Sequence, residues 1–252
     1  YRCANRAKRG VRGVPGRPGD RILVANPDRT GTERTWRWGA VRRAAWVLAC
    51  LALAACGAPQ NHYVAEKPGV AAAGSVYFTV PHEWTAFPAT AITSAQSGWA
   101  ADAAMKSVLD ATQWQEAFDA SAQPSLDHVL GAEPVDAPTV YASLRTVYGG
   151  ETVTAQSLRE MLLPLSTLGT AVKVLREENV DQGGAQGIHL VMSYAATDGA
   201  PEETIDQTSY LSDGKDAVYL LVVRCTTACY DAFADQIRSV TSSYTIQGDT
   251  RG

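Results

Sequence analysis

The cysteines are the residues whose type and spacing point most directly to chemistry in this sequence. Cys56 closes the run Leu53-Ala54-Ala55-Cys56 and is followed by a glycine. Small residues directly before a cysteine resemble the bacterial lipobox, in which the thiol is lipidated and the cysteine becomes the mature N-terminus. A diacylated Cys56 would hold the rest of the chain at a membrane, because two acyl chains anchor stably where one is marginal.

The residues before Cys56 fit a secretory signal. Arg42 and Arg43 precede an apolar run from Ala44 to Ala55, which is much shorter than the ~20 residues of a membrane-spanning helix. We therefore predict a signal peptide over residues 41–55 and a position at the cell membrane, lipid-anchored on the extracytoplasmic side. The alternative is an ordinary signal peptide that contains a cysteine by chance.

Residues 1–40 are expected to be a non-native upstream segment or a disordered one. They are rich in Arg, Gly and Pro, the first methionine is Met105, and a start at Val41 would give a signal of ordinary length. Residues 1–43 hold 12 of the 22 basic residues and 3 of the 26 acidic ones, so the rest is strongly acidic. A basic arm for nucleic acid is the alternative, but the acidic remainder argues against a nucleic-acid partner.

Cys225 and Cys229 form a second candidate pair, four residues apart. Cys225 ends an apolar run typical of a strand, and Cys229 falls in the first turn of an expected helix. Exported proteins meet an oxidising compartment, so we predict a structural disulfide between them. The alternatives are a redox-active pair, whose thiol pKa the helix N-terminus would lower, and a buried reduced pair.

The remaining reactive residue types form no recognisable catalytic or metal-binding motif. The four histidines are His62, His82, His128 and His189, and no two of them have the spacing of metal ligands. We expect neither a Gly-x-Ser-x-Gly nor a Ser-x-x-Lys nucleophile motif after Cys56. We therefore predict a protein that is not an enzyme, with no metal and no cofactor.

The elements that must position these residues are expected in one domain over residues 75–248, behind a flexible tether at 56–74. Period-two and helical patterns predict strands and helices in alternation. Strands are expected at 75–87, 113–121, 137–148, 170–180 and 187–197, and helices at 98–112, 124–131, 152–165 and 226–244.

The C-terminal third has the clearest pattern. Asp213-Gly214 lies between two strand-like runs and predicts a short hairpin turn with positive φ at both positions. The second run, 217–225, is apolar on both faces, which indicates a central strand covered on both sides. The closing helix has one apolar face and a cap at Thr226 or Thr227. Together these patterns predict an α+β sandwich, with helices packed on a mainly antiparallel sheet.

Four stretches resemble a known family. These are "FTVPHEW", the late hairpin, "VYLLVVRC" and a closing helix that ends in "SSYTI". They resemble the LpqN-type lipoproteins of actinobacteria, whose domain is similar to the PsbP-like fold, a curved antiparallel sheet with helices on its faces. The resemblance covers about residues 75–248 and implies a lipid-anchored binding or adaptor domain for a protein or an envelope component. It supplies no active site.

Aromatic residues in the N-terminal half are the remaining candidates for binding. Trp84, Trp99, Trp114 and Phe118 fit a core, and if they surround a pocket they would hold an apolar or ring-shaped ligand. That would make the protein a carrier of a small apolar molecule or lipid between sheet and helices. A closed apolar pocket favours this carrier, a flat apolar patch favours the adaptor, and convergent ionisable groups would favour an enzyme.

Overall fold

The computed structural model describes residues 61–66, 74–195 and 199–248. All of them belong to one compact unit within Gly57–Gly252. Residues 1–40, the expected signal peptide at 41–55 and Cys56 lie outside the described residues, so the statements about them stay predictions.

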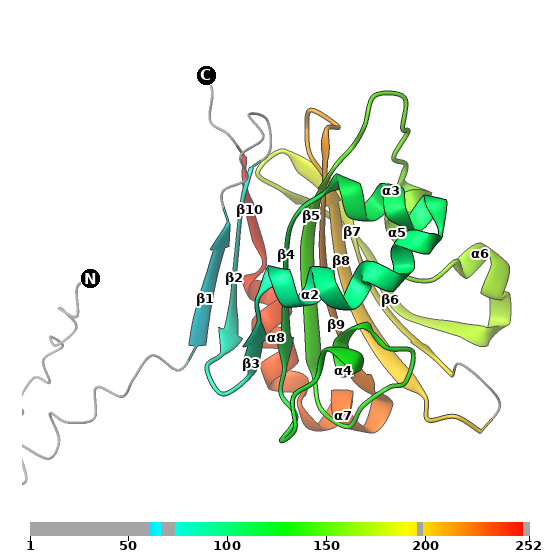
Figure 1. Ribbon diagram of the computed structural model, residues 1–252. Helices are drawn as coiled ribbons and strands as arrows, with labels where there is room; N and C mark the ends of the chain where they lie inside the picture. Colours follow the sequence, from blue (N-terminus) through cyan, green and yellow to red (C-terminus); the bar gives the residue numbers. More distant parts are fainter. Residues whose placement is uncertain (1–60, 67–73, 196–198, 249–252) are drawn as a thin grey trace, which may run out of the picture. The chain divides into compact units, whose positions relative to one another are not determined.

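Two antiparallel sheets form the framework of this unit (Figure 1). The larger sheet has seven strands in the order β3-β4-β5-β9-β8-β7-β6, and the smaller one has the order β1-β2-β10. Every pair of neighbours is antiparallel. The strands are β1 (Asn61–Glu66), β2 (Ser75–Pro81), β3 (Thr85–Phe87), β4 (Thr112–Asp119), β5 (Thr139–Thr146), β6 (Val172–Gln182), β7 (Ala185–Tyr194), β8 (Glu203–Leu211), β9 (Ala217–Thr226) and β10 (Thr245–Gln247).

Strand β9 lies in the middle of the larger sheet, between β5 and β8. Successive side chains on a strand point to opposite faces, and both sets of β9 are buried. Leu221 and Val223 belong to the cluster on one face, while Val218 and Val222 belong to the cluster on the other. The predicted central strand is confirmed.

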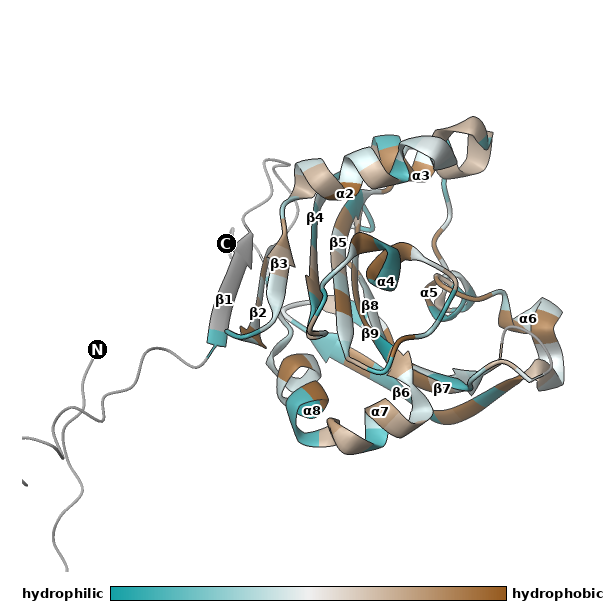
Figure 2. Ribbon diagram, turned by 60° about the horizontal axis from the view of Figure 1, so that its bottom comes forward, coloured by the Kyte–Doolittle hydropathy of each residue, from teal (hydrophilic) through white to brown (hydrophobic). Residues whose placement is uncertain are grey.

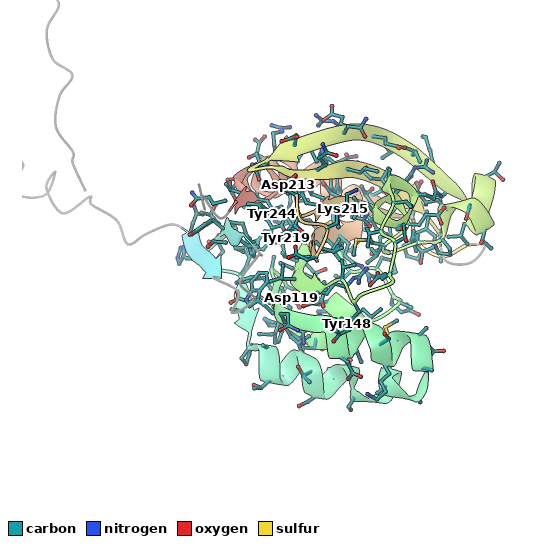
Figure 3. All side chains as sticks on the ribbon, turned by 90° about the horizontal axis from the view of Figure 1, so that it is seen from above. Asp119, Tyr148, Asp213, Lys215, Tyr219 and Tyr244 are labelled. Carbon is teal, nitrogen blue, oxygen red and sulfur yellow. A yellow bond between two sulfur atoms is a disulfide. The ribbon has the colours of Figure 1, made fainter. Side chains whose placement is uncertain are left out.

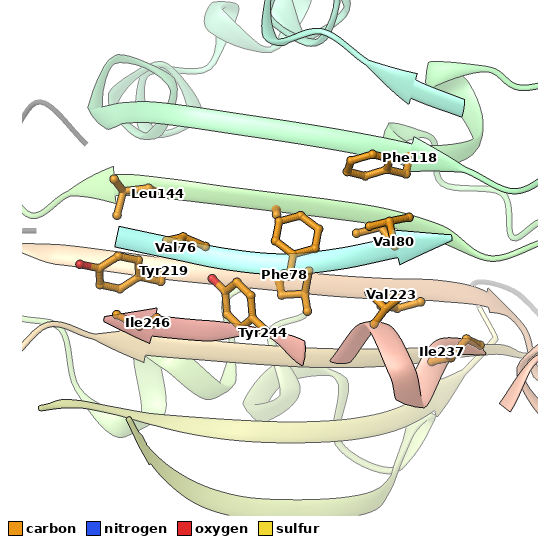
Figure 4. Close-up of a cluster of buried hydrophobic side chains, with 14 of the residues drawn as sticks. Val76, Phe78, Val80, Phe118, Leu144, Tyr219, Val223, Ile237, Tyr244 and Ile246 are labelled. Atoms are coloured by element: carbon orange, nitrogen blue, oxygen red, sulfur yellow. The ribbon is translucent and has the colours of Figure 1, made fainter. Parts of the chain in front are cut away.

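The first face packs against the smaller sheet and the C-terminal helices α7 (Thr227–Ala232) and α8 (Ala234–Ser243). Phe78 of β2 lies at the centre of this core (Figure 4). Its ring meets Trp114, Phe118 and Tyr244 edge to face, with centroids 6.4, 6.1 and 6.0 Å away. Aromatic pairs prefer this geometry.

The second face is covered by several short helices. They are α2 (Ala89–Ala95), the 3-10 turn η1 (Gln96–Ala101), α3 (Ala103–Ala111), α4 (Leu126–Leu130), α5 (Ala155–Arg159), α6 (Leu165–Leu168) and η2 (Gly169–Ala171). Figure 2 shows α2 and α3 on one side of the sheet and α7 and α8 on the other. The α+β class and the arrangement of helices on both faces of the sheet are thus confirmed.

Several expected boundaries differ from the structure. The strand expected at 75–87 ends at Pro81 as β2, and the chain forms the separate strand β3 from Thr85. Residues 61–66, placed in the flexible tether, form strand β1 against β2, because Tyr63 and Val64 are strand-favouring types inside an otherwise small-residue stretch. The helix expected at 152–165 is reduced to α5 at Ala155–Arg159, and α6 begins only after Pro164, which cannot continue a helix. The closing helix is interrupted at Phe233, which has φ −105° and ψ 17°.

The β8–β9 hairpin occurs where Asp213-Gly214 predicts it, but its turn is of another kind. The residue with positive φ is Lys215, at 58°. The Lys215 N–H donates to the Ser212 carbonyl at 2.9 Å, and the Ser212 hydroxyl accepts from the N–H of Asp216 at 3.1 Å. Figure 3 labels Asp213 and Lys215 in this turn. The sequence pattern located the hairpin, while the Ser212 side chain determined its geometry.

Candidate ligand-binding pocket

An apolar pocket of about 380 Å³ lies on the second face of the large sheet. Its floor is made by alternate side chains of two neighbouring strands, Tyr141 and Ser143 of β5 with Leu220 and Val222 of β9. These residues point away from the Phe78 core, because the intervening positions face it. Pockets of 300–1,000 Å³ with mostly apolar linings are typical of small-molecule sites.

The walls come from the helices that cover this face. They contribute Trp99, Met105, Val108 and Leu109 from η1 and α3, Val129 and Leu130 from α4, and Met161 and Leu162 after α5. Seven large hydrophobic residues of the described chain are exposed, and four of them, Trp99, Met105, Val108 and Leu162, line this pocket. Their exposed fractions are 37–45%, so a bound molecule would remove apolar surface from water.

Two arginines of the lining are each paired. Arg145 donates to both Glu151 carboxylate oxygens, at 3.0 and 2.7 Å, and these hydrogen bonds lower the pKa of Glu151. Arg224 pairs with buried Glu203 and donates to the Gly131 carbonyl at 2.8 Å. Burial raises the pKa of Glu203 in spite of Arg224. Both positive charges of the lining are therefore compensated by protein carboxylates.

The two arginines lie far apart along the floor of the pocket. Arg224 lies opposite Thr139 in the β5–β9 register, whereas Arg145 lies opposite Val218. Six steps along β5 separate these positions, which corresponds to ~20 Å at about 3.4 Å per residue.

A chain of polar side chains lies beneath α2 and η1. The Tyr141 hydroxyl donates to Gln115 Oε1 at 3.0 Å, and Gln115 Nε2 donates to Thr93 Oγ1 at 3.0 Å. Burial raises the pKa of Tyr141, although a hydrogen bond from the Gln96 side chain opposes this. Gln96 also lines the pocket and is only 3% exposed, yet its Oε1 has no hydrogen-bond partner within the described part of the chain.

The four aromatic candidates from the sequence do not meet in this pocket. Trp99 lines it, whereas Trp84 and Phe118 are buried in the core of the other face, and Trp114 packs against that core. Trp114 and Phe118 are four residues apart on β4 and so share one side of the strand. That side faces Phe78 and leaves the opposite side of the sheet to the pocket.

Sequence reasoning missed Met105, Val108 and Gln96 as lining residues. Met105 and Val108 are three positions apart on α3, the spacing of a helix face that packs into a core. Their exposure of 40% and 45% distinguishes them from core residues, and exposure of this kind becomes visible only in the folded chain.

Cys225 and Cys229 form a disulfide, as predicted, with their Cα atoms 5.9 Å apart. Cys225 is in β9 and Cys229 in the first turn of α7. The Thr226 hydroxyl caps this helix by accepting from the Cys229 N–H at 3.3 Å. The bond joins the central strand to the helix that follows it, on the face away from the pocket.

Ser121, His128 and Asp119 are residue types of a hydrolytic triad, but their geometry is different. Asp119 Oδ2 at 2.8 Å and Ser121 Oγ at 3.4 Å both face the same ring nitrogen, Nδ1. A triad uses one ring nitrogen for each partner. Asp119 instead accepts from the N–H groups of Ser121 and Ser125, at 2.7 and 2.9 Å. The cluster therefore orders the loop before α4.

His189 pairs with Asp206, which is buried. Its Nε2 lies 2.8 Å from Asp206 Oδ1, and the Tyr230 hydroxyl donates to Asp206 Oδ2 at 2.7 Å. Burial and the Asp206 charge raise the pKa of Tyr230. Across the described ranges, no three His, Cys, Asp or Glu side chains are grouped as a metal site would require.

Ser212 and Lys215 have the Ser-x-x-Lys spacing of some acyl-transfer enzymes, so the expectation that this motif is absent after Cys56 was wrong. Both residues belong to the β8–β9 turn. The Ser212 hydroxyl donates to Asp216 Oδ1 at 2.6 Å and accepts from backbone N–H groups. Its role is to shape the turn.

Comparisons with known proteins concern the fold alone. No family model and no curated protein matches the chain. Among solved structures, LpqN of Mycobacterium tuberculosis, described as involved in cell envelope biogenesis, is 18% identical, with a TM-score of 0.45 over 75% of this chain and 92% of that one. Cyanobacterial PsbP from Synechocystis is 10% identical, with a TM-score of 0.45 over 76% and 95%. The Ran-binding protein Mog1p of Saccharomyces cerevisiae is 12% identical, with a TM-score of 0.41 over 75% and 97%.

LpqN and a PsbP-like protein, which the sequence resembles, are thus among the solved structures that match, each with a TM-score of 0.45. Within the described ranges, none of the helices has the length and apolar character needed to cross a bilayer.

Proposed function

We propose that this protein is a lipid-anchored binding protein of the cell envelope that carries a small apolar molecule in the pocket over β5 and β9. The observation that carries this proposal is the pocket itself, about 380 Å³ in volume and lined mainly by apolar side chains. Four exposed hydrophobic residues surround a concavity here, and a concave apolar site suits a small ligand. The geometry thus favours the carrier over a flat adaptor surface.

Binding of an uncharged apolar dye tests the pocket. The full chain with Cys56→Ser, which cannot be lipidated at that position, would be titrated with N-phenyl-1-naphthylamine while dye fluorescence is recorded. We expect saturable binding. Val108→Asp should weaken it at least about tenfold, because it places a carboxylate in the apolar lining.

Val174→Asp is the matched control. Val174 is 40% exposed against 45% for Val108, but it lies on β6 outside the pocket lining. The control should bind the dye as the parent does. Absence of saturable binding, or equal weakening by both substitutions, would contradict the proposal.

The anchor is tested separately, in an actinobacterial host that exports and lipidates the full chain. The unsubstituted chain should sediment with membranes and partition into detergent, whereas Cys56→Ser should appear in the soluble fraction. Retention of Cys56→Ser at the membrane would rule out attachment through a lipid on Cys56.

A protein partner is the second candidate function, and one observation favours it. Strand β6 is at the edge of the larger sheet, and its Val174 and Leu175 are 40% and 47% exposed. An exposed strand edge can accept a further strand from a partner. A photocrosslinking residue at Leu175 should then give one discrete adduct in the host, which the same residue at Val108 does not give. No discrete adduct from Leu175 would remove this candidate.

A further inference from the structure

Gln96 is the polar group that distinguishes this pocket from a purely apolar one. Gln96 is only 3% exposed and lines the pocket. Its Oε1 accepts no hydrogen bond from the described part of the chain. A buried acceptor without a donor is unfavourable, because the hydrogen bond that it made to water in the unfolded chain is not replaced. A ligand that supplies the missing donor would recover this free energy on binding.

Other side-chain oxygen atoms of the lining have partners, and that of Ser143 is hydrogen-bonded with Tyr141. Thr112 Oγ1 donates to the Val108 carbonyl at 2.9 Å, and Thr139 Oγ1 donates to the Arg224 carbonyl at 3.2 Å. The Ser157 hydroxyl takes part in the capping box with Thr154 at the start of α5. The lining therefore lacks a hydrogen-bond donor for Gln96 Oε1.

The charges of the lining indicate what the ligand should lack. Arg145 is held by Glu151 and Arg224 by Glu203. An anionic head would compete with these carboxylates for the guanidinium N–H groups, and displacing Glu203, which is buried, would leave that carboxylate without its cation at a cost. A head without formal charge leaves both pairs intact.

We propose that the pocket selects uncharged amphiphiles, with an apolar body along β5 and β9 and a hydroxyl or amide head that donates a hydrogen bond to Gln96 Oε1. This inference rests on the proposed function, since it names the ligand class of the same pocket. It predicts that the pocket distinguishes between ligands that differ by one hydrogen-bond donor.

Three probes with a ten-carbon chain test that donor: 1-decanol, decyl methyl ether, which carries one further methyl group, and decanoate at pH 8. Each would displace N-phenyl-1-naphthylamine from the full chain with Cys56→Ser. We expect 1-decanol to displace the dye about tenfold more tightly than the ether, which offers no donor. Decanoate should be the weakest of the three, because it is anionic and offers no donor either.

Gln96→Met keeps a similar shape and removes the acceptor, so it should bring 1-decanol and the ether within about twofold of each other while dye binding persists. Gln113→Met, an exposed position on β4 outside the lining, is the matched control and should retain the preference. Equal displacement by 1-decanol and the ether in the parent, or tightest displacement by decanoate, would overturn the inference and leave the pocket proposal standing. Loss of dye binding in the parent would instead overturn the proposed function.

Discussion

Asp119 is a buried carboxylate held by several donors at the end of β4. Burial by itself would raise its pKa, but the N–H groups of Ser121 and Ser125 and the His128 ring outweigh burial and lower the pKa below the usual 3.8. A lowered pKa means that the folded state favours the ionised form. The resulting stabilisation is present above the unfolded pKa and is lost as the pH falls through the folded value.

Asp119→Asn should therefore lower the free energy of unfolding at pH 7 by about 1–3 kcal/mol, and the difference from the parent should shrink below about pH 4. Urea unfolding at pH 7 and at pH 3 measures both values. Exposed Asp213→Asn serves as the control and should change stability by less than about 0.5 kcal/mol. A difference at Asp119 that does not vary with pH would contradict the assignment of its pKa.

Strand β7 requires a glycine where it passes β8. A Cβ atom at Gly187 would lie 2.1 Å from the Ser209 carbonyl oxygen and 2.7 Å from the Tyr210 ring. Since the nearest atom belongs to the backbone of the paired strand, the contact can be relieved only by moving the two strands apart. The close approach of β7 to β8 at this point therefore depends on a glycine.

Gly187→Ala should cost about 3 kcal/mol or more in the free energy of unfolding, because the strain falls within a packed pair of strands. Gly98→Ala is the matched control: it lies in η1, where an added Cβ meets nothing within 4 Å. That substitution should be neutral or stabilise by up to about 1 kcal/mol. Chemical denaturation of both variants measures these changes in the free energy of unfolding. Equal losses in the two variants would show that the close approach of β7 to β8 does not cause the loss at Gly187.

The domain as a whole has a rigid centre and a thinner layer of helices over the pocket. Strands β5, β9 and β8 lie in the middle of the seven-stranded sheet, whereas the covering helices run for only four to nine residues. Local opening is easiest where few buried contacts must break. The layer over the pocket is thus the part through which a ligand would enter.

Amide hydrogen exchange tests this difference. We expect the slowest exchange in β5, β8 and β9, and faster exchange in η1, α3 and α4. N-phenyl-1-naphthylamine should slow exchange in 96–111 and 126–130 and leave α8 unchanged, because a ligand stabilises the elements it contacts. Equal slowing throughout the domain would argue against binding at this pocket.

Much of the fold follows from local patterns in the sequence. The apolar run 217–225 indicates a strand buried on both faces, and β9 is the central strand. Asp213-Gly214 marks the final hairpin, and the spacing of Cys225 and Cys229 predicts their disulfide. Each of these inferences depends on residues close together in the chain, where alternation and turn preference act directly.

The position and the lining of the pocket depend on the tertiary structure. Gln96, Tyr141 and Arg224 meet there although 128 residues separate the first from the last, and no local pattern reports on such a meeting. Alternation shows that Trp114 and Phe118 share one side of β4, but it does not show whether that side faces a filled core or a pocket. That choice depended on where β2 and α8 packed, because their side chains fill one face of the sheet and the short helices leave space on the other.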